Sequence, residues 1–161
     1  MRFVMILAFF LLSGPASAQA LWQEAARVNL AINSSMRYAS DQEVWGAEDY
    51  WASPKESAQV GRGDCEDFAI AKFFAAKASG LKARLAYGRL GGQGHMVAIV
   101  WDGQRWLVLD CTTDAIIPLD GHPTFQALYS FDERDVWTSD GRVFAGKADS
   151  LGKWQAVLAK I

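Results

Sequence analysis

The chain has 161 residues, with 16 basic and 18 acidic side chains and a formal net charge of −2. Hydrophobic residues make up 51% of the chain, a share that is typical of a globular domain and excludes a disordered or collagen-like protein. The near-neutral charge excludes the broad basic surface that nucleic-acid binding needs, so we expect no nucleic-acid partner. The length is that of one domain with a substantial hydrophobic core.

The first eighteen residues have the pattern of a secretory signal peptide. Arg2 is followed by the apolar run Phe3–Leu12 and then by Ala16-Ser17-Ala18, an A-x-A cleavage pattern. The apolar run is shorter than the roughly 20 residues that a membrane span takes, although an N-terminal anchor is the alternative. We therefore expect residues 1–18 to be a signal peptide and residues 19–161 to form one domain outside the cytoplasm, without stable membrane insertion.

Four segments have helical patterns. Residues 21–32 carry an apolar stripe with helical spacing, and the order Ser-Pro-Lys-Glu at residues 53–56 is typical of a helix start. A longer helix is predicted to begin at Asp64, which can cap it, with Asp67 at the position of a capping-box acid. The last helix is expected over Asp149–Lys160.

From Lys82 onward the pattern is that of β-strands. The expected strands are Lys82–Leu90, His95–Trp101, Gln104–Asp110, Phe125–Phe131 and Arg142–Ala145. Residues 91–94 read as a flexible loop, and Asp102-Gly103 is typical of a two-residue hairpin turn. Helices followed by an antiparallel sheet predict an α+β fold.

The predicted hairpin brings together two residues that can do chemistry. A two-residue turn at Asp102-Gly103 places His95 directly opposite Asp110. Cross-strand partners share one face of the sheet and are close enough for a hydrogen bond. A carboxylate behind a histidine fixes its tautomer and stabilises the imidazolium, which is half of a catalytic triad. From the hairpin alone, a surface His–Asp pair without a catalytic role is equally compatible.

Cys65 supplies a candidate nucleophile in the first turn of the Asp64 helix, where the helix dipole lowers the pKa of a thiol. Its neighbours Asp64, Glu66 and Asp67 act in the opposite direction, because like charges raise the pKa of the thiol. A divalent cation would offset them, and Ca²⁺ prefers such carboxylate oxygens, although three solvated first-turn acids are the alternative. A cysteine at a helix start facing a His–Asp pair is typical of papain-like and transglutaminase-like enzymes.

The two cysteines also permit a non-enzymatic interpretation. In an oxidising compartment, Cys65 and Cys111 could form a structural disulfide that staples a small interaction domain. Strand alternation predicts that Cys111 points away from Asp110, which favours an inert side chain over a redox partner.

Three blocks resemble the bacterial transglutaminase-like cysteine peptidases of the LapG type. They are Gly63-Asp64-Cys65-Glu66-Asp67-Phe68-Ala69, Gly94-His95-Met96-Val97 and Val108-Leu109-Asp110. The resemblance implies a papain/transglutaminase-like single domain, with N-terminal helices packed on an antiparallel sheet and the nucleophile at a helix N-terminus. It implies Cys65 as nucleophile, His95 as general base and acid, and Asp110 as the orienting carboxylate. It also implies Ca²⁺ beside the nucleophile, held by Asp64 and Glu66 with Asp67 as a further ligand.

The same resemblance implies a periplasmic endopeptidase that cleaves a large surface adhesin at a di-alanine site near its N-terminus and so releases the cell from a biofilm. An inner-membrane receptor for cyclic di-GMP is the implied regulatory partner. Transglutaminase-type transfer to an amine uses the same triad and stays an open alternative, because access to the pocket decides between water and amine.

Overall fold

The structure, a computed structural model, describes residues 17–139 and 143–161. Its helices are α1 (Ala18–Ser35), α2 (Asp41–Trp45), α3 (Pro54–Val60), α4 (Cys65–Ala78), the 3₁₀ turn η1 (Ala148–Ser150) and α5 (Gly152–Leu158). Its strands are β1 (Arg37–Tyr38), β2 (Arg62–Gly63), β3 (Ala83–Leu90), β4 (Gln93–Trp101), β5 (Trp106–Leu109), β6 (Ile117–Pro118), β7 (Phe125–Phe131), β8 (Asp135–Thr138) and β9 (Phe144–Lys147). The greater part of the predicted signal peptide, residues 1–16, lies outside the described residues. Within the two described ranges, no helix has the length and apolar character to cross a bilayer.

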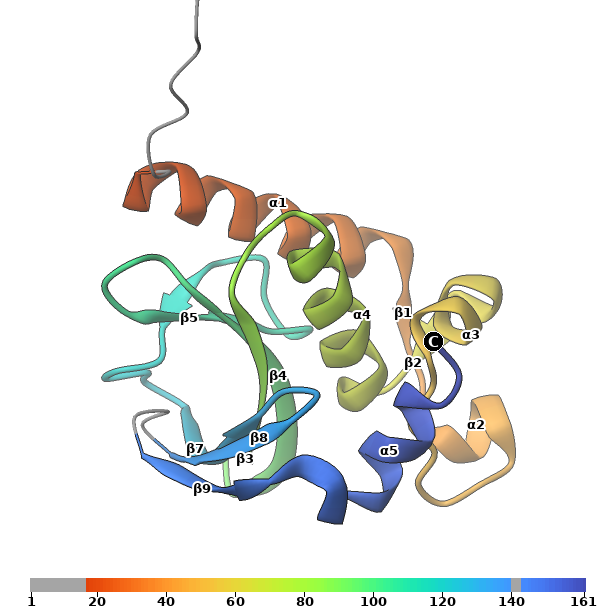
Figure 1. The fold of residues 1–161 in the computed structure, drawn as a ribbon. Coiled ribbons are helices and arrows are strands. Elements are labelled where there is room, and N and C mark those ends of the chain that lie inside the picture. Colours follow the sequence, from red (N-terminus) through yellow and green to blue (C-terminus); the bar gives the residue numbers. More distant parts are fainter. Residues whose placement is uncertain (1–16, 140–142) are drawn as a thin grey trace, which may run out of the picture.

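A mixed arrangement of helices and antiparallel sheet confirms the predicted α+β class. The larger sheet has the strand order β6-β5-β4-β3-β7-β8-β9, with antiparallel neighbours throughout. Helix α4 packs on the central strands β3 and β4, and α1 lies across α4 and β5 (Figure 1). The short parallel pair β1–β2 leads the chain directly into the start of α4. The sheet and α4 together therefore form the frame that positions the site.

Local capping signals locate the helix starts correctly. The Ser53 hydroxyl accepts from the Glu56 backbone N–H and the Glu56 carboxylate accepts from the Ser53 N–H at 2.7 Å, so α3 begins with a capping box. Helix α4 begins at Cys65, and the Asp64 carboxylate caps it by accepting from the Glu66 N–H at 3.2 Å. The expected capping-box role of Asp67 is wrong. Its carboxylate is fully buried and accepts instead from the Ala52 N–H at 2.8 Å.

The β4–β5 hairpin differs from the predicted one by two residues. Trp101 pairs with Trp106, so the loop has four residues and not two. The cause is the Asp102 carboxylate, which accepts from the backbone N–H groups of Gln104 and Arg105 at 2.8 Å each and closes a wider turn. His95 and Asp110 are therefore not directly opposite. Because the shift is an even number and strand side chains alternate with period two, both residues keep the predicted face.

Some predicted boundaries also move. The loop expected over residues 91–94 is only a turn at Gly91-Gly92, where both residues have positive φ (57° and 86°), so that β4 begins earlier than expected, at Gln93. The last expected strand corresponds to β9, two residues later in the chain, and Arg142 lies outside the described residues. The last helix is shorter than expected, because Leu151 (φ −85°, ψ 80°) separates η1 from α5.

Trp154 of α5 joins the last helix to the main core. The side chain is fully buried, and its ring meets Phe73 of α4 edge-on at 5.5 Å and Phe131 of β7 at 5.7 Å between centroids. Its indole N–H donates to the Asp132 carbonyl at 2.8 Å, so the one polar atom of the ring is satisfied. The C-terminal helix is thereby fixed to both α4 and the sheet.

Replacement of this ring should cost far more than replacement of an exposed aromatic residue. We expect Trp154→Ala to lower the free energy of unfolding by about 3–5 kcal/mol, through lost burial and a cavity. Phe144→Ala on β9, where the side chain is 56% exposed, should cost less than about 1 kcal/mol. Urea unfolding followed by circular dichroism measures both, and equal losses would contradict the assignment of α5 to the core.

Candidate active site

Cys65 lies at the N-terminus of α4, against the strand that carries His95. The residue is 9% exposed, and the backbone N–H of Met96, the residue that follows His95 on β4, acts to lower the pKa of its thiol, against the larger effect of burial. The helix start and the β4 backbone thus hold the candidate nucleophile next to the candidate base. No hydrogen bond joins Cys65 to His95 within the described part of the chain.

The predicted His95–Asp110 pair is present and buried. His95 Nε2 lies 2.9 Å from Asp110 Oδ1, and the two residues are 7% and 2% exposed. The same carboxylate oxygen accepts from the Thr112 N–H at 2.9 Å. Burial opposes ionisation of Asp110, but the hydrogen bonds from His95 and Thr112 outweigh it and lower the pKa of this carboxyl to about 2. Since Nε2 is engaged, Nδ1 is the ring nitrogen left to exchange a proton with a thiol.

The Cys65 thiol itself is held in its protonated form. Its Sγ donates to Glu66 Oε2 at 2.8 Å. Burial, together with the negative charge of Glu66, raises the pKa of Cys65 well above its usual value. Desolvation and the adjacent carboxylate therefore act against the lowering of the pKa that the sequence analysis expects from the helix dipole. A change in the electrostatics of this turn is needed before the thiolate can form.

Three carboxylates converge beside the nucleophile. Oxygens of Asp41, Asp64 and Asp67 all lie within 4.8 Å of one another. The backbone N–H groups of Tyr50 and Ala52 donate to one oxygen each of Asp41 and Asp67. The second oxygens, Asp41 Oδ1 and Asp67 Oδ2, are buried without a hydrogen-bond partner. Three carboxylates gathered in this way, two of them with a buried oxygen that lacks a partner, are a donor set that fits a hard cation such as Ca²⁺.

The pKa values of these three groups reflect the crowding. Burial, followed by repulsion from the neighbouring carboxylates, raises the pKa of Asp64 to about 8. Burial likewise raises the pKa of Asp67 to about 6 and shifts that of Asp41 upward. The cluster is strained whenever all three carboxylates are ionised.

This arrangement partly matches the ligands predicted from the sequence. Asp64 and Asp67 are brought together, but the Glu66 carboxylate contacts the Cys65 thiol and does not belong to the cluster. Asp41, which the sequence analysis missed, takes its place. Asp41 reaches the site because β1 pairs with β2 and α2 begins directly after β1. A buried aspartate at a short helix start carries no local signal of such convergence.

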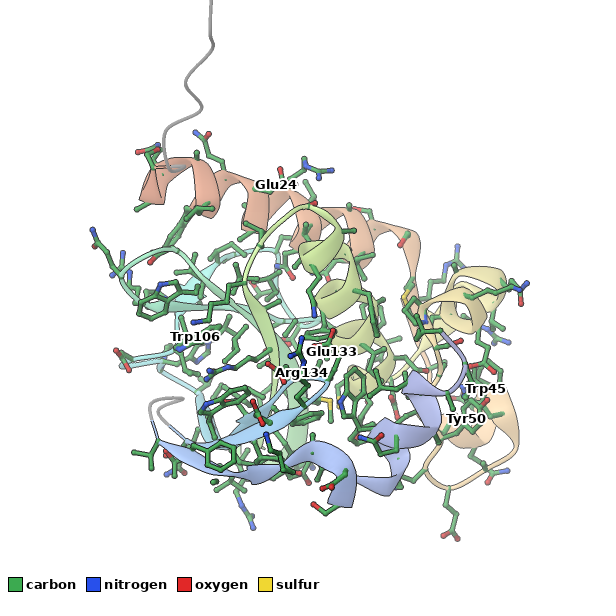
Figure 2. All side chains as sticks on the ribbon, viewed as in Figure 1. Glu24, Trp45, Tyr50, Trp106, Glu133 and Arg134 are labelled. Carbon is green, nitrogen blue, oxygen red and sulfur yellow. The ribbon has the colours of Figure 1, made fainter. Side chains whose placement is uncertain are left out.

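The segment that supplies the supporting N–H groups is itself anchored. Lys160 Nζ donates to Tyr50 Oη at 2.8 Å, to the Trp51 carbonyl at 3.2 Å and to Glu56 Oε2 at 3.0 Å. Tyr50 also packs on Trp45 of α2, with ring centroids 4.8 Å apart (Figure 2). Lys160 thus holds in place the segment whose backbone N–H groups donate to Asp41 and Asp67.

Cys111 does not point away from the site. Strand β5 ends at Leu109, so the alternation that predicted this orientation no longer applies at position 111. The Cys111 sulfur lies within 4.8 Å of a ring nitrogen of His95 and of a carboxylate oxygen of Asp110. Both cysteines are free thiols, so the structure lacks the disulfide on which the alternative of a stapled domain depends.

The crowded carboxylates predict an unusual pH dependence of stability. The folded-state pKa values of Asp64 and Asp67 lie above the ordinary 3.8, so the folded protein keeps protons that the unfolded chain releases. The free energy of unfolding should therefore fall as the pH rises from 5 to 8 in the presence of a chelator. Asp64→Asn, which keeps the helix cap, should raise this free energy at pH 8 by about 1–3 kcal/mol and less at pH 5.

Urea unfolding in EDTA at the two pH values measures this effect. Asp149→Asn makes the same chemical change at an exposed aspartate of η1, and its effect should stay within about 0.5 kcal/mol. Wild-type stability that rises from pH 5 to 8, with no gain from Asp64→Asn, would contradict the repulsion described here.

The comparisons with known proteins agree with this site. Residues 13–141 match the bacterial transglutaminase-like cysteine proteinase family, BTLCP. Legionella pneumophila LapG is 31% identical over 87% of this chain and 78% of its own, with a TM-score of 0.73. Its calcium-bound form is 30% identical, covers 89% and 84% of the two chains and has a TM-score of 0.72. A putative cysteine protease from Cytophaga hutchinsonii shares the fold, at 17% identity over 71% of this chain and 41% of its own, with a TM-score of 0.52.

No curated protein sequence is significantly similar to the chain. The family match covers most of the sequence, and the LapG structures cover most of this chain at 30–31% identity. The chain therefore belongs to the bacterial transglutaminase-like cysteine proteinases.

Proposed function

We propose that this protein is a calcium-dependent cysteine endopeptidase in which Cys65 is the nucleophile, His95 the general base and acid, and Asp110 the orienting carboxylate. The observation that carries the proposal is the buried His95–Asp110 hydrogen bond of 2.9 Å, with His95 on β4, the strand against which the Cys65 helix α4 packs. Membership of a cysteine proteinase family supports it independently.

In the proposed acyl-transfer reaction, each of these residues has one part. His95 Nδ1 takes the proton from the Cys65 sulfur, which attacks the peptide carbonyl and forms a C–S bond. The developing oxyanion accepts from the Cys65 backbone N–H, one of the helix-start amides without an intrahelical acceptor. His95 then protonates the leaving amine, the C–N bond breaks, and water hydrolyses the thioester with His95 as base. Asp110 holds the ring by Nε2 and stabilises its positive charge.

Calcium is proposed at the carboxylate cluster, held by Asp41, Asp64 and Asp67. The buried oxygens without partners support this site, and the calcium-bound form of Legionella LapG supports the choice of ion. The positive charge of the bound ion would offset the carboxylates that keep the Cys65 thiol protonated. Glu66 as a ligand stays a prediction, since its carboxylate contacts the thiol here.

The proposed substrate is a large surface adhesin, cleaved at a di-alanine site in its N-terminal region, so that cleavage releases cells from a biofilm. The proposed location is the periplasm, reached by means of the signal peptide over residues 1–18, and the proposed regulator is an inner-membrane cyclic di-GMP receptor. The sequence likeness to LapG-type peptidases supports these assignments. Cell fractionation, and retention of the adhesin on cells that lack this protein, test them.

The catalytic roles are tested with peptides centred on Ala-Ala and cleavage followed by mass spectrometry. Cys65→Ala and His95→Ala should lower kcat/KM at least about 1,000-fold, and Asp110→Asn at least about 100-fold, because each removes a member of the proton-transfer unit. Cys111→Ser removes the other thiol and should keep the rate within about threefold. Cleavage by Cys65→Ala at the wild-type rate, or incorporation of a labelled amine without hydrolysis, would contradict the proposal.

The calcium site is tested by isothermal titration calorimetry on chelator-treated protein. Asp41→Asn should weaken Ca²⁺ binding about tenfold or more, because it removes one of three converging carboxylates, and Mg²⁺ should bind more weakly than Ca²⁺ to both proteins. Glu48→Gln removes the same charge from an exposed position in the loop after α2 and should change the affinity less than about twofold.

Activity gives a second view of the same site. EGTA should suppress cleavage, and Ca²⁺ should restore it in preference to Mg²⁺. Equal Ca²⁺ affinities of Asp41→Asn and wild type would remove Asp41 from the site, and full activity in excess EGTA would remove the calcium requirement while leaving the triad in place.

A further inference from the structure

A second cluster of potential metal ligands includes two residues of the proposed catalytic triad. A ring nitrogen of His95, a carboxylate oxygen of Asp110 and the sulfur of Cys111 all lie within 4.8 Å of one another. The proposed peptidase mechanism uses the first two residues and leaves the Cys111 thiol without a role. The donor set is one nitrogen, one oxygen and one sulfur, which differs in kind from the all-oxygen calcium cluster.

These donors fit a thiophilic cation and not a hard one. Zn²⁺ binds imidazole nitrogen, carboxylate oxygen and thiolate sulfur at about 2.0–2.3 Å, usually with tetrahedral geometry. Donors at those distances lie roughly 3–4 Å apart, so the three side chains need to close only slightly around an ion. Calcium and magnesium, in contrast, take oxygen ligands. His95 and Asp110 are buried and Cys111 is partly exposed, so the ion can enter from the Cys111 side.

The charges around the cluster permit a divalent ion. Asp110 is ionised, because its hydrogen bonds hold its pKa near 2. Burial and the Asp110 charge raise the pKa of Cys111 to about 12, so the free thiol keeps its proton until an ion displaces it. A positive charge close enough to act on this cluster is that of Lys72 of α4, whose Nζ is buried without a hydrogen-bond partner.

We propose that His95, Asp110 and Cys111 form a binding site for a thiophilic divalent cation of the Zn²⁺ class, and that the bound ion inhibits the enzyme. On binding, the Cys111 S–H bond breaks, its proton goes to solvent and a sulfur–metal bond forms, with no change of oxidation state. The His95 ring stays neutral, with its proton on the nitrogen that the metal does not use. The Asp110 carboxylate and the Cys111 thiolate together balance the two positive charges of the ion.

Inhibition follows from the residues that the ion occupies. The same imidazole and carboxylate that would move the Cys65 proton are held by the metal, so His95 can no longer act as a base. The inhibitory part of the inference rests on the proposed peptidase function, whereas the binding part rests only on the geometry of the three side chains. The two parts can therefore fail separately.

Cobalt spectroscopy tests the binding part without any measurement of activity. The chain has two cysteines, so Cys65→Ser leaves Cys111 as its only thiol. With excess Ca²⁺ present to fill the carboxylate cluster, one equivalent of Co²⁺ should give a near-ultraviolet sulfur-to-cobalt charge-transfer band that Zn²⁺ removes. The matched control Cys65→Ser/Cys111→Ser should give no such band, and His95→Ala in the Cys65→Ser background should weaken it.

Inhibition is then measured on the active protein. Zn²⁺ should inhibit peptide cleavage by wild type at a concentration at least about tenfold lower than that needed for Cys111→Ser, which keeps the Cys65–His95 pair. Absence of the cobalt band from folded Cys65→Ser, as judged by circular dichroism, would overturn the site. Equal Zn²⁺ sensitivity of wild type and Cys111→Ser would overturn its inhibitory role. A cobalt band in Cys65→Ser combined with no peptidase activity of the wild-type protein would leave the metal site intact and contradict the proposed function instead.

Discussion

Repulsion among carboxylates at the start of α4 is the constraint on which the site depends. Asp64 caps the helix, Asp67 is fully buried within its first turn, and Asp41 arrives from the end of β1, so that three acids share one small volume. The fold holds them there with backbone N–H groups, and these satisfy only part of their oxygens. Protons retained by Asp64 and Asp67 relieve part of this repulsion, and a bound cation would relieve more, with a charge that would also act on the adjacent thiol.

Contacts around the site keep the three carboxylates close together despite their mutual repulsion. A Cβ at position 63 would collide with the Asp67 carboxylate, so glycine is the residue that fits there without a shift of Asp67. The segment from Tyr50 to Glu56 cannot relax outward, because Lys160 holds it from the end of the chain and α5 is fixed to the core through Trp154.

The sequence predicted those features of the fold and the site that depend on interactions between residues close together in the chain. The capping residues Ser53 and Asp64 located two helix starts, and the His95–Asp110 pair was correct although its register was off by two, because an even shift preserves the face of a strand. Asp41 and Cys111 were missed or misplaced because their positions depend on tertiary structure. One is carried by the β1–β2 pairing, and the other lies just beyond the end of β5, where strand alternation ceases.

The structure holds two clusters of potential metal ligands with different chemical preferences. In one, only oxygens converge, and a hard cation there would lower the cost of forming the Cys65 thiolate. In the other, nitrogen, oxygen and sulfur converge at His95, the proposed base. Because the two donor sets select different ions, occupancy of one does not require loss of the other. In this proposal, one ion controls the fraction of Cys65 that is thiolate, and the other controls the fraction of His95 that can accept a proton. The rate of peptide cleavage depends on the product of these two fractions.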